Sequence, residues 1–279
     1  MIKIGLTGFS GILGKNLSSL ISKKKIYRIY KYRHNVLNKK EVFNWIEKNQ
    51  FNVIIHLAAL VPTKKVNINF SLSKRINIEG TQNLIDGINE LQKKSLYFLF
   101  SSTSHVYNFN LKKNSEDSKI FGISKYGKTK IAAEKYIRTK LIKADVCIAR
   151  ISSLVSEEQT DNFFLPHLVR KGKSKNIIQF KNSNVVRNFI HVSDVSKILL
   201  KLVEKRVKGT INVSTSERTH FKKLFVLLSK KYNFKIQSGY LKPEYLDLSN
   251  NLLLKKIGIY NFMKLEKIIE KIYNNRYQK

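Results

Sequence analysis

The stretch "TGFSGILG" at residues 7–14 has a glycine at every third position: Gly8, Gly11 and Gly14. The residues before it, "IKIGLT" (2–7), have the pattern of a strand, and "ILGKNLSSLIS" (12–22) carries apolar residues at helical spacing. Glycine permits a tight turn and a close approach of backbone N–H groups to a ligand, and the start of a helix attracts negative charge. This strand–turn–helix context predicts a site for the pyrophosphate of a dinucleotide.

Strand-like and helix-like segments alternate after this turn. The expected strands are "IYRIYK" (26–31), "NVIIHLAA" (52–59), "LYFLFSS" (96–102) and "DVCIAR" (145–150). The expected helices between them are "KKEVFNWIEKN" (39–49), "RINIEGTQNLIDGINELQ" (75–92) and residues 124–141. Because strands separated by helices of about ten residues or more need crossover connections, we predict a Rossmann-type, doubly wound α/β fold with a parallel sheet.

The pattern becomes shorter and less regular after Arg150. We therefore predict a dinucleotide-binding domain over residues 1–155 and a smaller substrate-binding lobe over residues 156–279. Within that lobe, the segment 186–203 contains a strand-like stretch and an apolar helix, so we expect it to pack back on the sheet.

The chain is strongly basic, with 53 Lys and Arg against 19 Asp and Glu and a formal net charge of +34. The basic residues are spread along the whole chain, together with abundant Asn and Ile, which indicates an A/T-rich genome more than a specific nucleic-acid partner. The one cysteine, Cys147, excludes an internal disulfide. The apolar run "FNVIIHLAALV" is too short to cross a membrane and no secretory leader is visible, so we expect a cytoplasmic protein without a membrane partner.

The stretch "SKYGKTKIAAEKYI" (124–137) places Tyr126 and Lys130 four residues apart on an expected helix, and therefore on one face. In so basic a chain this pair is compatible with two interpretations: a surface contact, or a phenol held beside a cation so that it can transfer a proton. An ammonium about 4 Å away favours a phenolate by up to about 4 kcal/mol at an effective dielectric near 20. The spacing alone does not choose between the two.

Several further motifs occur in order along the chain. They are "HLAA" (56–59), Asn77 in "NIEGTQNLI", "FSSTSHVY" (100–107), "RNFIHVSDV" (187–195) and "LDLSNNLLLKKIGI" near the end. With the glycine turn and the Tyr126/Lys130 pair, the chain resembles the extended short-chain dehydrogenase/reductase family, in the branch that acts on nucleotide-activated sugars.

This resemblance implies a catalytic set of Thr103, Tyr126 and Lys130. Tyr126 would exchange a proton with the sugar oxygen, Thr103 would hydrogen-bond that oxygen, and Lys130 would also hold the nicotinamide ribose. The expected contacts of an NAD(P) cofactor are Gly8, Phe9, Ser10, Gly11, Ile12, Leu13, Gly14, Lys31, Arg33, Leu57, Ala58, Ala59, Asn77, Ser101, Tyr126 and Lys130. The resemblance also implies a nucleotide-sugar substrate and a homodimer.

Two departures from the family pattern bear on cofactor and reaction. The stretch "YKYRHN" (30–35) lacks an acidic residue for the ribose 2′-hydroxyl and offers Lys31 and Arg33 to a 2′-phosphate, so NADP is favoured over NAD. Ser104 and His105 replace the Asp-Glu pair of sugar-nucleotide dehydratases, which argues against dehydration.

The expected substrate contacts are Ser104, His105, Ser153 and Arg187. Arg187 matches an arginine that clamps the nucleotide diphosphate in the family. The next residue is Asn188 where aspartate is usual, and Ser153 stands where many members have a substrate-binding asparagine, so the sugar cannot be named. The six histidines lack ligand spacing and predict no metal site. His56 and His191 are interpreted as structural, and His167 stays undecided.

The sequence therefore predicts an NAD(P)-dependent oxidoreductase that reduces a 4-keto group of a nucleotide-linked deoxysugar, for surface polysaccharide synthesis. A 4-epimerase that retains its cofactor would use the same catalytic set. A non-catalytic Rossmann-like binding protein, including a basic nucleic-acid binder, is the alternative from another class.

Overall fold

The computed structural model describes residues 1–61, 63–93, 95–110, 112–173 and 177–275. Its largest sheet has six parallel strands in the order β10-β5-β4-β3-β1-β2. They are β1 (Ile2–Thr7), β2 (Tyr27–Lys31), β3 (Val53–His56), β4 (Leu96–Thr103), β5 (Ala144–Ile151) and β10 (Gly209–Val213). The chain leaves β1 toward one edge and later crosses to β3 on the other side, so a crevice opens at the carboxyl ends of these two strands. The predicted doubly wound Rossmann-type fold is confirmed.

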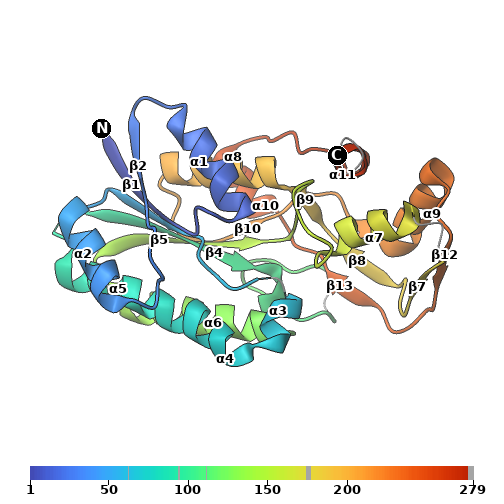
Figure 1. Cartoon of the computed structure of the whole chain (residues 1–279), viewed down its shortest axis with the longest axis horizontal. Helices are drawn as coiled ribbons and strands as arrows, with labels where there is room; N and C mark the ends of the chain where they lie inside the picture. The colour runs from blue at the N-terminus through green and yellow to red at the C-terminus, as the bar shows by residue number, and fades with distance from the viewer. Residues whose placement is uncertain (62, 94, 111, 174–176, 276–279) are drawn as a thin grey trace.

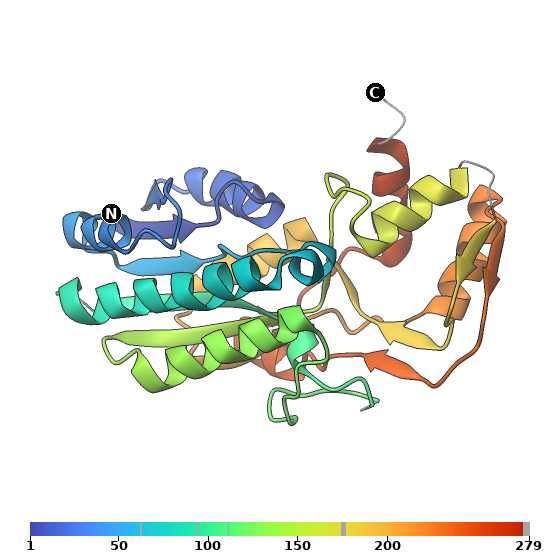
Figure 2. The ribbon, with the colours of Figure 1, turned by 60° about the horizontal axis from the view of Figure 1, so that its bottom comes forward.

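Helices cover both faces of this sheet (Figures 1 and 2). One face carries α1 (Ile12–Ser22), α8 (Val192–Glu204) and α10 (Asn251–Ile257), and the other carries α2 (Lys39–Asn49), α5 (Gly80–Leu91) and α6 (Lys125–Lys140). Side chains alternate between two buried cores because successive residues of a strand point to opposite faces. Ile55 joins the core under α1, whereas its neighbour Ile54 joins the core under α2 and α5.

The second half of the chain also builds this sheet. Helix α8 packs beside α1, and Ile198 and Leu199 enter the same core as the residues of β1. Strand β10 then pairs in parallel with β5. The periodicity of the sequence did not assign this strand, and the sheet consequently takes its sixth strand from beyond residue 155.

The connection between β3 and α5 departs from the expected single helix over residues 75–92. Two short helices, α3 (Thr63–Ile68) and α4 (Phe70–Lys74), come first, and a π-helical turn at Arg75–Glu79 precedes α5. Such turns are uncommon and often lie at functional sites. Here the turn contains Asn77.

The remaining elements form a smaller lobe, which lies at the carboxyl ends of the sheet strands (Figure 1). Its helices are α7 (Phe164–Lys173), α9 (Phe221–Tyr232) and α11 (Leu265–Asn275), and its strands are β7 (Ile178–Phe180), β8 (Val185–Arg187), β11 (Thr219–His220), β12 (Ile236–Ser238) and β13 (Glu244–Leu246). A third core of buried apolar side chains holds it together. The two-stranded ribbon of β6 (Ser153–Val155) and β9 (Phe189–His191) connects it to the sheet.

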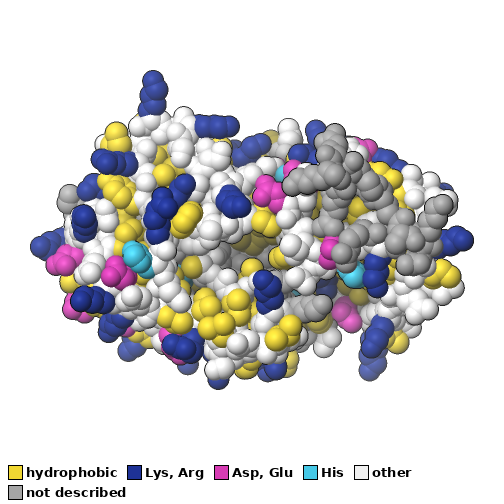
Figure 3. Space-filling model, in the orientation of Figure 1, with side chains coloured by type: hydrophobic (Ala, Val, Ile, Leu, Met, Phe, Trp, Pro, Cys, Tyr) yellow, Lys and Arg dark blue, Asp and Glu magenta, His cyan; other side chains and the backbone are white. Residues whose placement is uncertain are grey.

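Lysine and arginine side chains are scattered over the face shown in Figure 3 and do not gather in one stripe. Within the described part of the chain, no helix combines the length and apolar character needed to cross a membrane.

Candidate active site

A cleft of about 1110 Å³ lies where the strand ends meet the smaller lobe. Its walls come from segments far apart in the sequence: the glycine turn, the residues after β2 and β3, the end of β4, the start of α6, the ribbon of β6 and β9, and the start of α7. Most of the predicted site residues line it, namely Gly8, Phe9, Ser10, Gly11, Ile12, Leu13, Gly14, Arg33, Leu57, Ala58, Ala59, Ser101, Thr103, Ser104, His105, Tyr126, Ser153 and Arg187.

The glycine turn is shaped by its contacts with neighbouring backbone. Gly8 has a φ of +70°, and a Cβ there would lie 2.6 Å from the backbone nitrogen of Ala58. A Cβ on Gly14 would lie 2.1 Å from the carbonyl oxygen of Gly8, so the fold itself requires both glycines. A Cβ on Gly11 would meet no atom closer than 3.5 Å. Gly11 precedes α1 without a side-chain cap, so the missing side chain leaves the helix start clear for an anion and fits a pyrophosphate.

Two cations flank the ring of Phe9 at the adenosine end of the expected cofactor site. The Lys31 Nζ lies 5.7 Å and the Arg33 Cζ 5.8 Å from the ring centroid. Arg33 lines the cleft together with His34 and Asn35, whereas Lys31 is not among the lining residues. The structure therefore distinguishes Arg33, which lines the cleft, from Lys31, which does not.

His56 and Asn77 lie behind the cleft wall. His56 is fully buried, its Nδ1 is 2.6 Å from Thr7 Oγ1 and its Nε2 is 3.0 Å from Thr81 Oγ1. Burial lowers the pKa of the imidazole to about 3, so His56 is neutral, and its structural interpretation agrees with these contacts.

Asn77 accepts a hydrogen bond from the backbone N–H of Leu60 (2.7 Å) and donates one to Thr129 Oγ1 (3.0 Å). It thereby joins the loop after β3 to α6. Asn77 was predicted as a direct cofactor contact, but the structure places it one layer behind the cleft, where it holds the residues after β3 in place.

The end of β4 and the start of α6 are clamped together. Thr103 Oγ1 accepts the backbone N–H of His105 (3.3 Å), and His105 Nδ1 is 3.2 Å from the hydroxyl of Ser124. Ser124 also caps α6, because its Oγ accepts the backbone N–H of Gly127 (3.0 Å). The ring of Tyr126 meets the edge of His105 with 6.1 Å between centroids. Thr103 and Tyr126 are thus brought to the same part of the cleft.

The two members of the predicted tyrosine–lysine pair are both shifted by burial. Burial raises the pKa of the Tyr126 phenol, opposite to the direction expected from the spacing. The Lys130 Nζ lies 4.2 Å from the centroid of the Phe100 ring, and burial lowers the pKa of this amine to about 7. Burial of the phenol itself causes the rise in the pKa of Tyr126, and the spacing of two residues in the sequence does not reveal that burial.

His105 is a neutral side chain in this wall. Burial and, to a smaller extent, the positive charge of Arg187 together lower the pKa of its imidazole to about 4. A neutral imidazole can donate or accept a hydrogen bond, so His105 fits the predicted contact with a polar substrate group better than a role as a cation.

Arg187 reaches the cleft from the end of β8. Its Nε is buried without a hydrogen-bond partner, its guanidinium lies 5.6 Å from the centroid of the Phe221 ring, and burial lowers its pKa. A buried donor without a partner costs free energy unless a ligand satisfies it. A phosphate oxygen is the acceptor that suits a guanidinium best.

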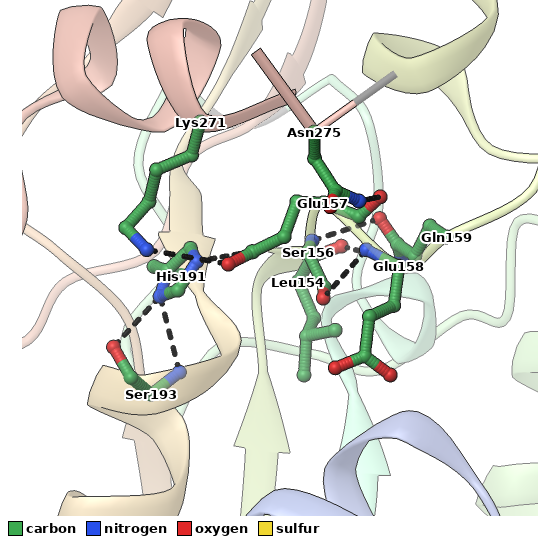
Figure 4. Close-up of polar contacts among 9 residues, drawn as sticks. All are labelled: Leu154, Ser156, Glu157, Glu158, Gln159, His191, Ser193, Lys271 and Asn275. Atoms are coloured by element: carbon green, nitrogen blue, oxygen red, sulfur yellow. Dashed lines mark hydrogen bonds and ion pairs between the residues drawn. The ribbon is translucent and has the colours of Figure 1, made fainter. Parts of the chain in front are cut away.

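A second polar cluster holds residues 156–159 beside the cleft (Figure 4). The Glu157 carboxylate contacts His191 Nε2 (2.9 Å) and Lys271 Nζ (3.2 Å), and its carbonyl oxygen accepts the side-chain amide of Asn275 (3.0 Å). Gln159, in the same segment, lines the cleft. His191 therefore has a structural role, because it ties this wall to β9, whereas Lys271 and Asn275 tie the wall to α11.

Some residues at the cleft were not singled out by the sequence. Asp161, Asn162 and Phe163 line it beside His167, on the lobe side. They follow no recognisable motif, so only the fold could place them there. Within the described residues, no group of three or more His, Cys, Asp or Glu side chains is arranged to hold a metal ion.

The sequence analysis did not single out Glu134, although helical spacing places it on the same face of α6 as Lys130. Glu134 lies four residues after Lys130 on α6, and its carboxylate forms a bidentate ion pair with Arg150, at 3.1 and 2.7 Å. Both side chains are almost completely buried. Glu134 also accepts a hydrogen bond from Ser102, so the pair lies next to the strand end that carries Thr103.

Comparisons with known proteins agree with this geometry. Residues 4–214 match the model of the NAD dependent epimerase/dehydratase family. The chain is 28% identical over 291 residues to GDP-6-deoxy-D-talose 4-dehydrogenase of Aggregatibacter actinomycetemcomitans, a match that covers 99% of this chain and 98% of that protein.

Two solved structures have the same fold. One is RMD from Pseudomonas aeruginosa complexed with NADPH, with a TM-score of 0.85 and 20% identity over 99% of this chain and 98% of that one. The other is a variant of the UDP-glucuronic acid 4-epimerase of Bacillus cereus in complex with NAD and a fluorinated UDP-glucuronic acid, with a TM-score of 0.86 and 19% identity over 99% of both chains. Because the family match covers most of the chain and includes the glycine turn and the predicted catalytic set, this protein belongs to the NAD-dependent epimerase/dehydratase family of enzymes.

Proposed function

We propose that this enzyme is an NADP-dependent reductase that converts the 4-keto group of a nucleotide-linked deoxysugar to a hydroxyl. The observation that carries the proposal is a single cleft that joins the glycine turn, the Thr103–Tyr126 pair and the buried Arg187. Such a cleft can hold a dinucleotide and a nucleotide sugar end to end. NADPH, when bound, supplies the hydride.

The protonation of Tyr126 favours reduction. In a reduction the phenol must start protonated, because it gives its proton to the oxygen of the former ketone. Burial raises the pKa of Tyr126 and so favours that form. Thr103 would hydrogen-bond the same oxygen, and the positive charge of Lys130 would stabilise the phenolate that remains.

The substrate class rests on Arg187 and on the relatives. The unpaired guanidinium nitrogen of Arg187 suits the diphosphate of a nucleotide sugar. The relative named GDP-6-deoxy-D-talose 4-dehydrogenase acts at C4 of a nucleotide-linked deoxysugar, and reduction of the 4-keto group is the reverse of such a reaction. A cytoplasmic location, a role in surface polysaccharide synthesis and a homodimer are also part of this proposal, and the family resemblance supports the last two.

NADP rather than NAD is supported by the residues after β2. Arg33 lines the cleft at the position where a 2′-phosphate would lie, and an acidic side chain for the 2′-hydroxyl is not found in "YKYRHN".

The proposal is tested by incubating the protein with NADPH and a panel of 4-keto nucleotide sugars. We expect loss of NADPH in step with formation of the 4-hydroxy sugar. Interconversion of two hydroxy sugars without net loss of NADPH would identify a 4-epimerase instead. No turnover of any nucleotide sugar, combined with tight binding of nucleic acid that weakens steeply with salt, would reject the enzyme proposal.

The Tyr126→Phe variant tests the mechanism. Loss of a general acid should reduce kcat by about 10²- to 10⁴-fold while the Kd for NADPH changes by no more than a few-fold. Tyr136→Phe is a matched control, because Tyr136 lies on the same helix and hydrogen-bonds Asp86 (2.6 Å), outside the cleft lining. Equal activity of the two variants would remove Tyr126 from the mechanism.

A further inference from the structure

The buried carboxylate of Glu134 is the centre of a polar network behind the catalytic residues. It accepts a hydrogen bond from the hydroxyl of Ser102, the residue before Thr103 on β4. It also accepts two hydrogen bonds from one edge of the Arg150 guanidinium, from Nε and Nη2, at the end of β5. The network therefore joins the ends of two neighbouring sheet strands to α6.

Arg150 extends this network away from the cleft. Its Nη1 donates to the hydroxyl of Tyr107 (2.9 Å) and to the carbonyl oxygen of Glu116 (3.2 Å), and Tyr107 donates to Asn212 Oδ1 on β10 (2.7 Å). The Nε, Nη1 and Nη2 atoms of Arg150 therefore all have hydrogen-bond partners. A buried ion pair of this kind adds little to stability compared with apolar side chains of the same volume, so stability alone does not explain it.

Lys130 lies one helical turn from Glu134 on α6. Burial lowers the pKa of the Lys130 amine, and the negative charge of Glu134, one helical turn away, raises it. The other titratable or charged groups near Lys130 and Glu134 are His56, Tyr126 and Arg138. His56 is neutral, and the Nη2 of Arg138 lies 3.8 Å from Glu134 Oε2. Glu134 is the negative charge that acts on Lys130.

We propose that Glu134 is a positioning residue of this active site: through Ser102 and Arg150 it holds the strand end that carries Thr103, and from one helical turn away its negative charge favours the charged form of the Lys130 amine. This inference rests on the proposed function, because a charged Lys130 matters only if Tyr126 transfers a proton. Arg150 sets the strength of the effect, since it neutralises part of the Glu134 charge. Removal of Glu134 and removal of Arg150 should therefore shift the pKa of Lys130 in opposite directions.

The direct test is an NMR titration of the lysine side chains in the protein without ligand, with the Lys130 signal identified by its loss in Lys130→Met. Glu134→Gln should lower the pKa of Lys130 by about one pH unit or more, because a lone Arg150 cation then faces it. Arg150→Met should raise that pKa. The double variant should give a smaller decrease than Glu134→Gln, so it decides the question if a single variant does not fold.

Tyr107→Phe is the matched control for damage to the network. It removes a hydroxyl that Arg150 contacts and touches neither Glu134 nor Lys130, so it should lower thermal stability and leave the pKa of Lys130 unchanged. In kinetic assays, the alkaline limb of kcat/KM should move to lower pH in Glu134→Gln, with about a ten-fold loss near pH 8 and a smaller loss near pH 6.

The titration and the kinetics separate two kinds of failure. An unchanged Lys130 pKa in Glu134→Gln, Arg150→Met and the double variant would overturn the role of Glu134, whatever the enzyme does. A wild-type protein that turns over no nucleotide sugar, but shows the opposite shifts of Lys130, would reject the proposed function and keep the coupling.

Discussion

Lys31 and Arg33 are two residues apart in the chain and carry the same charge, but they occupy different places around Phe9. Only Arg33 lines the cleft, and its planar guanidinium suits a phosphate better than an ammonium does. Sequence reasoning offered both to a 2′-phosphate, because the end of a strand does not reveal which of two alternate side chains turns toward the ligand. The two residues therefore form a natural pair for a test of cofactor choice.

Arg33→Ala should weaken NADPH binding about ten- to a hundred-fold, which corresponds to the loss of a charge-assisted hydrogen bond worth about 1.5–3 kcal/mol. NADH, which lacks the 2′-phosphate, should lose no more than about three-fold. Lys31→Ala should change both affinities by about three-fold or less, because Lys31 does not line the cleft. Fluorescence titrations with both cofactors measure these values. Equal losses for NADPH and NADH in Arg33→Ala would show that the 2′-phosphate is not bound there.

The catalytic pair shows where residue-level prediction stops. The spacing of Tyr126 and Lys130 placed both on one helix face, and α6 confirms the helix. Spacing could not reveal that the Lys130 amine lies over Phe100, on a strand that precedes the helix by more than twenty residues in the sequence. The direction of both pKa shifts depends on this burial, and burial is a property of the folded chain.

At the scale of elements, apolar periodicity predicted the long helices and the buried strands well. The segments expected at 12–22 and 39–49 coincide with α1 and α2. Short elements escaped prediction, such as β10 and the π-helical turn before α5, because a few residues do not establish a period. The π-helical turn depends on distant contacts, since Asn77 bonds both Leu60 and Thr129.

The start of α6 is the element whose placement matters most for chemistry. A Cβ on Gly127 would lie 2.2 Å from the carbonyl oxygen of His105, so only glycine lets the helix approach the end of β4 this closely. Helix propensity predicts the opposite preference, because alanine is favoured over glycine by about 1 kcal/mol within a helix. The close approach overrides the propensity, and it sets the distance between Tyr126 and Thr103.

Gly127→Ala should therefore reduce kcat/KM by roughly ten-fold or more and lower the melting temperature, since even a displacement of about 1 Å at a catalytic group can cost about 10²-fold in rate. Gly87→Ala on α5 is the control. Its Cβ would meet the flexible ends of Ile46 and Phe43, so stability should change and kcat/KM should not. Steady-state kinetics and thermal melts on both variants measure this. Wild-type kcat/KM in Gly127→Ala would mean that the approach of α6 does not position Tyr126.

At the scale of the whole molecule, the dominant property is the net charge of +34. Because the basic side chains are spread over the surface in Figure 3, they repel one another and together attract anions. The proposed ligands, a nucleotide sugar and NADPH, are both anionic, so the same field that destabilises the fold should draw them toward the cleft. The few surface ion pairs, such as Lys208 with Asp145 (2.7 Å), offset little of this repulsion.

Salt should consequently act on stability and on substrate capture with opposite signs. Raising NaCl from about 20 to about 200 mM shortens the Debye length from about 20 Å to about 7 Å, which screens most repulsion between exposed lysines. The melting temperature should therefore rise, whereas the KM for the nucleotide sugar should increase because its attraction is screened as well. Near pH 10.1, the isoelectric point, the net charge disappears and salt should leave the melting temperature almost unchanged. Calorimetry at both pH values and steady-state kinetics near neutrality measure these effects, and a melting temperature that falls with NaCl near neutrality would show that ion pairs, and not repulsion between lysines, govern the electrostatics of this fold.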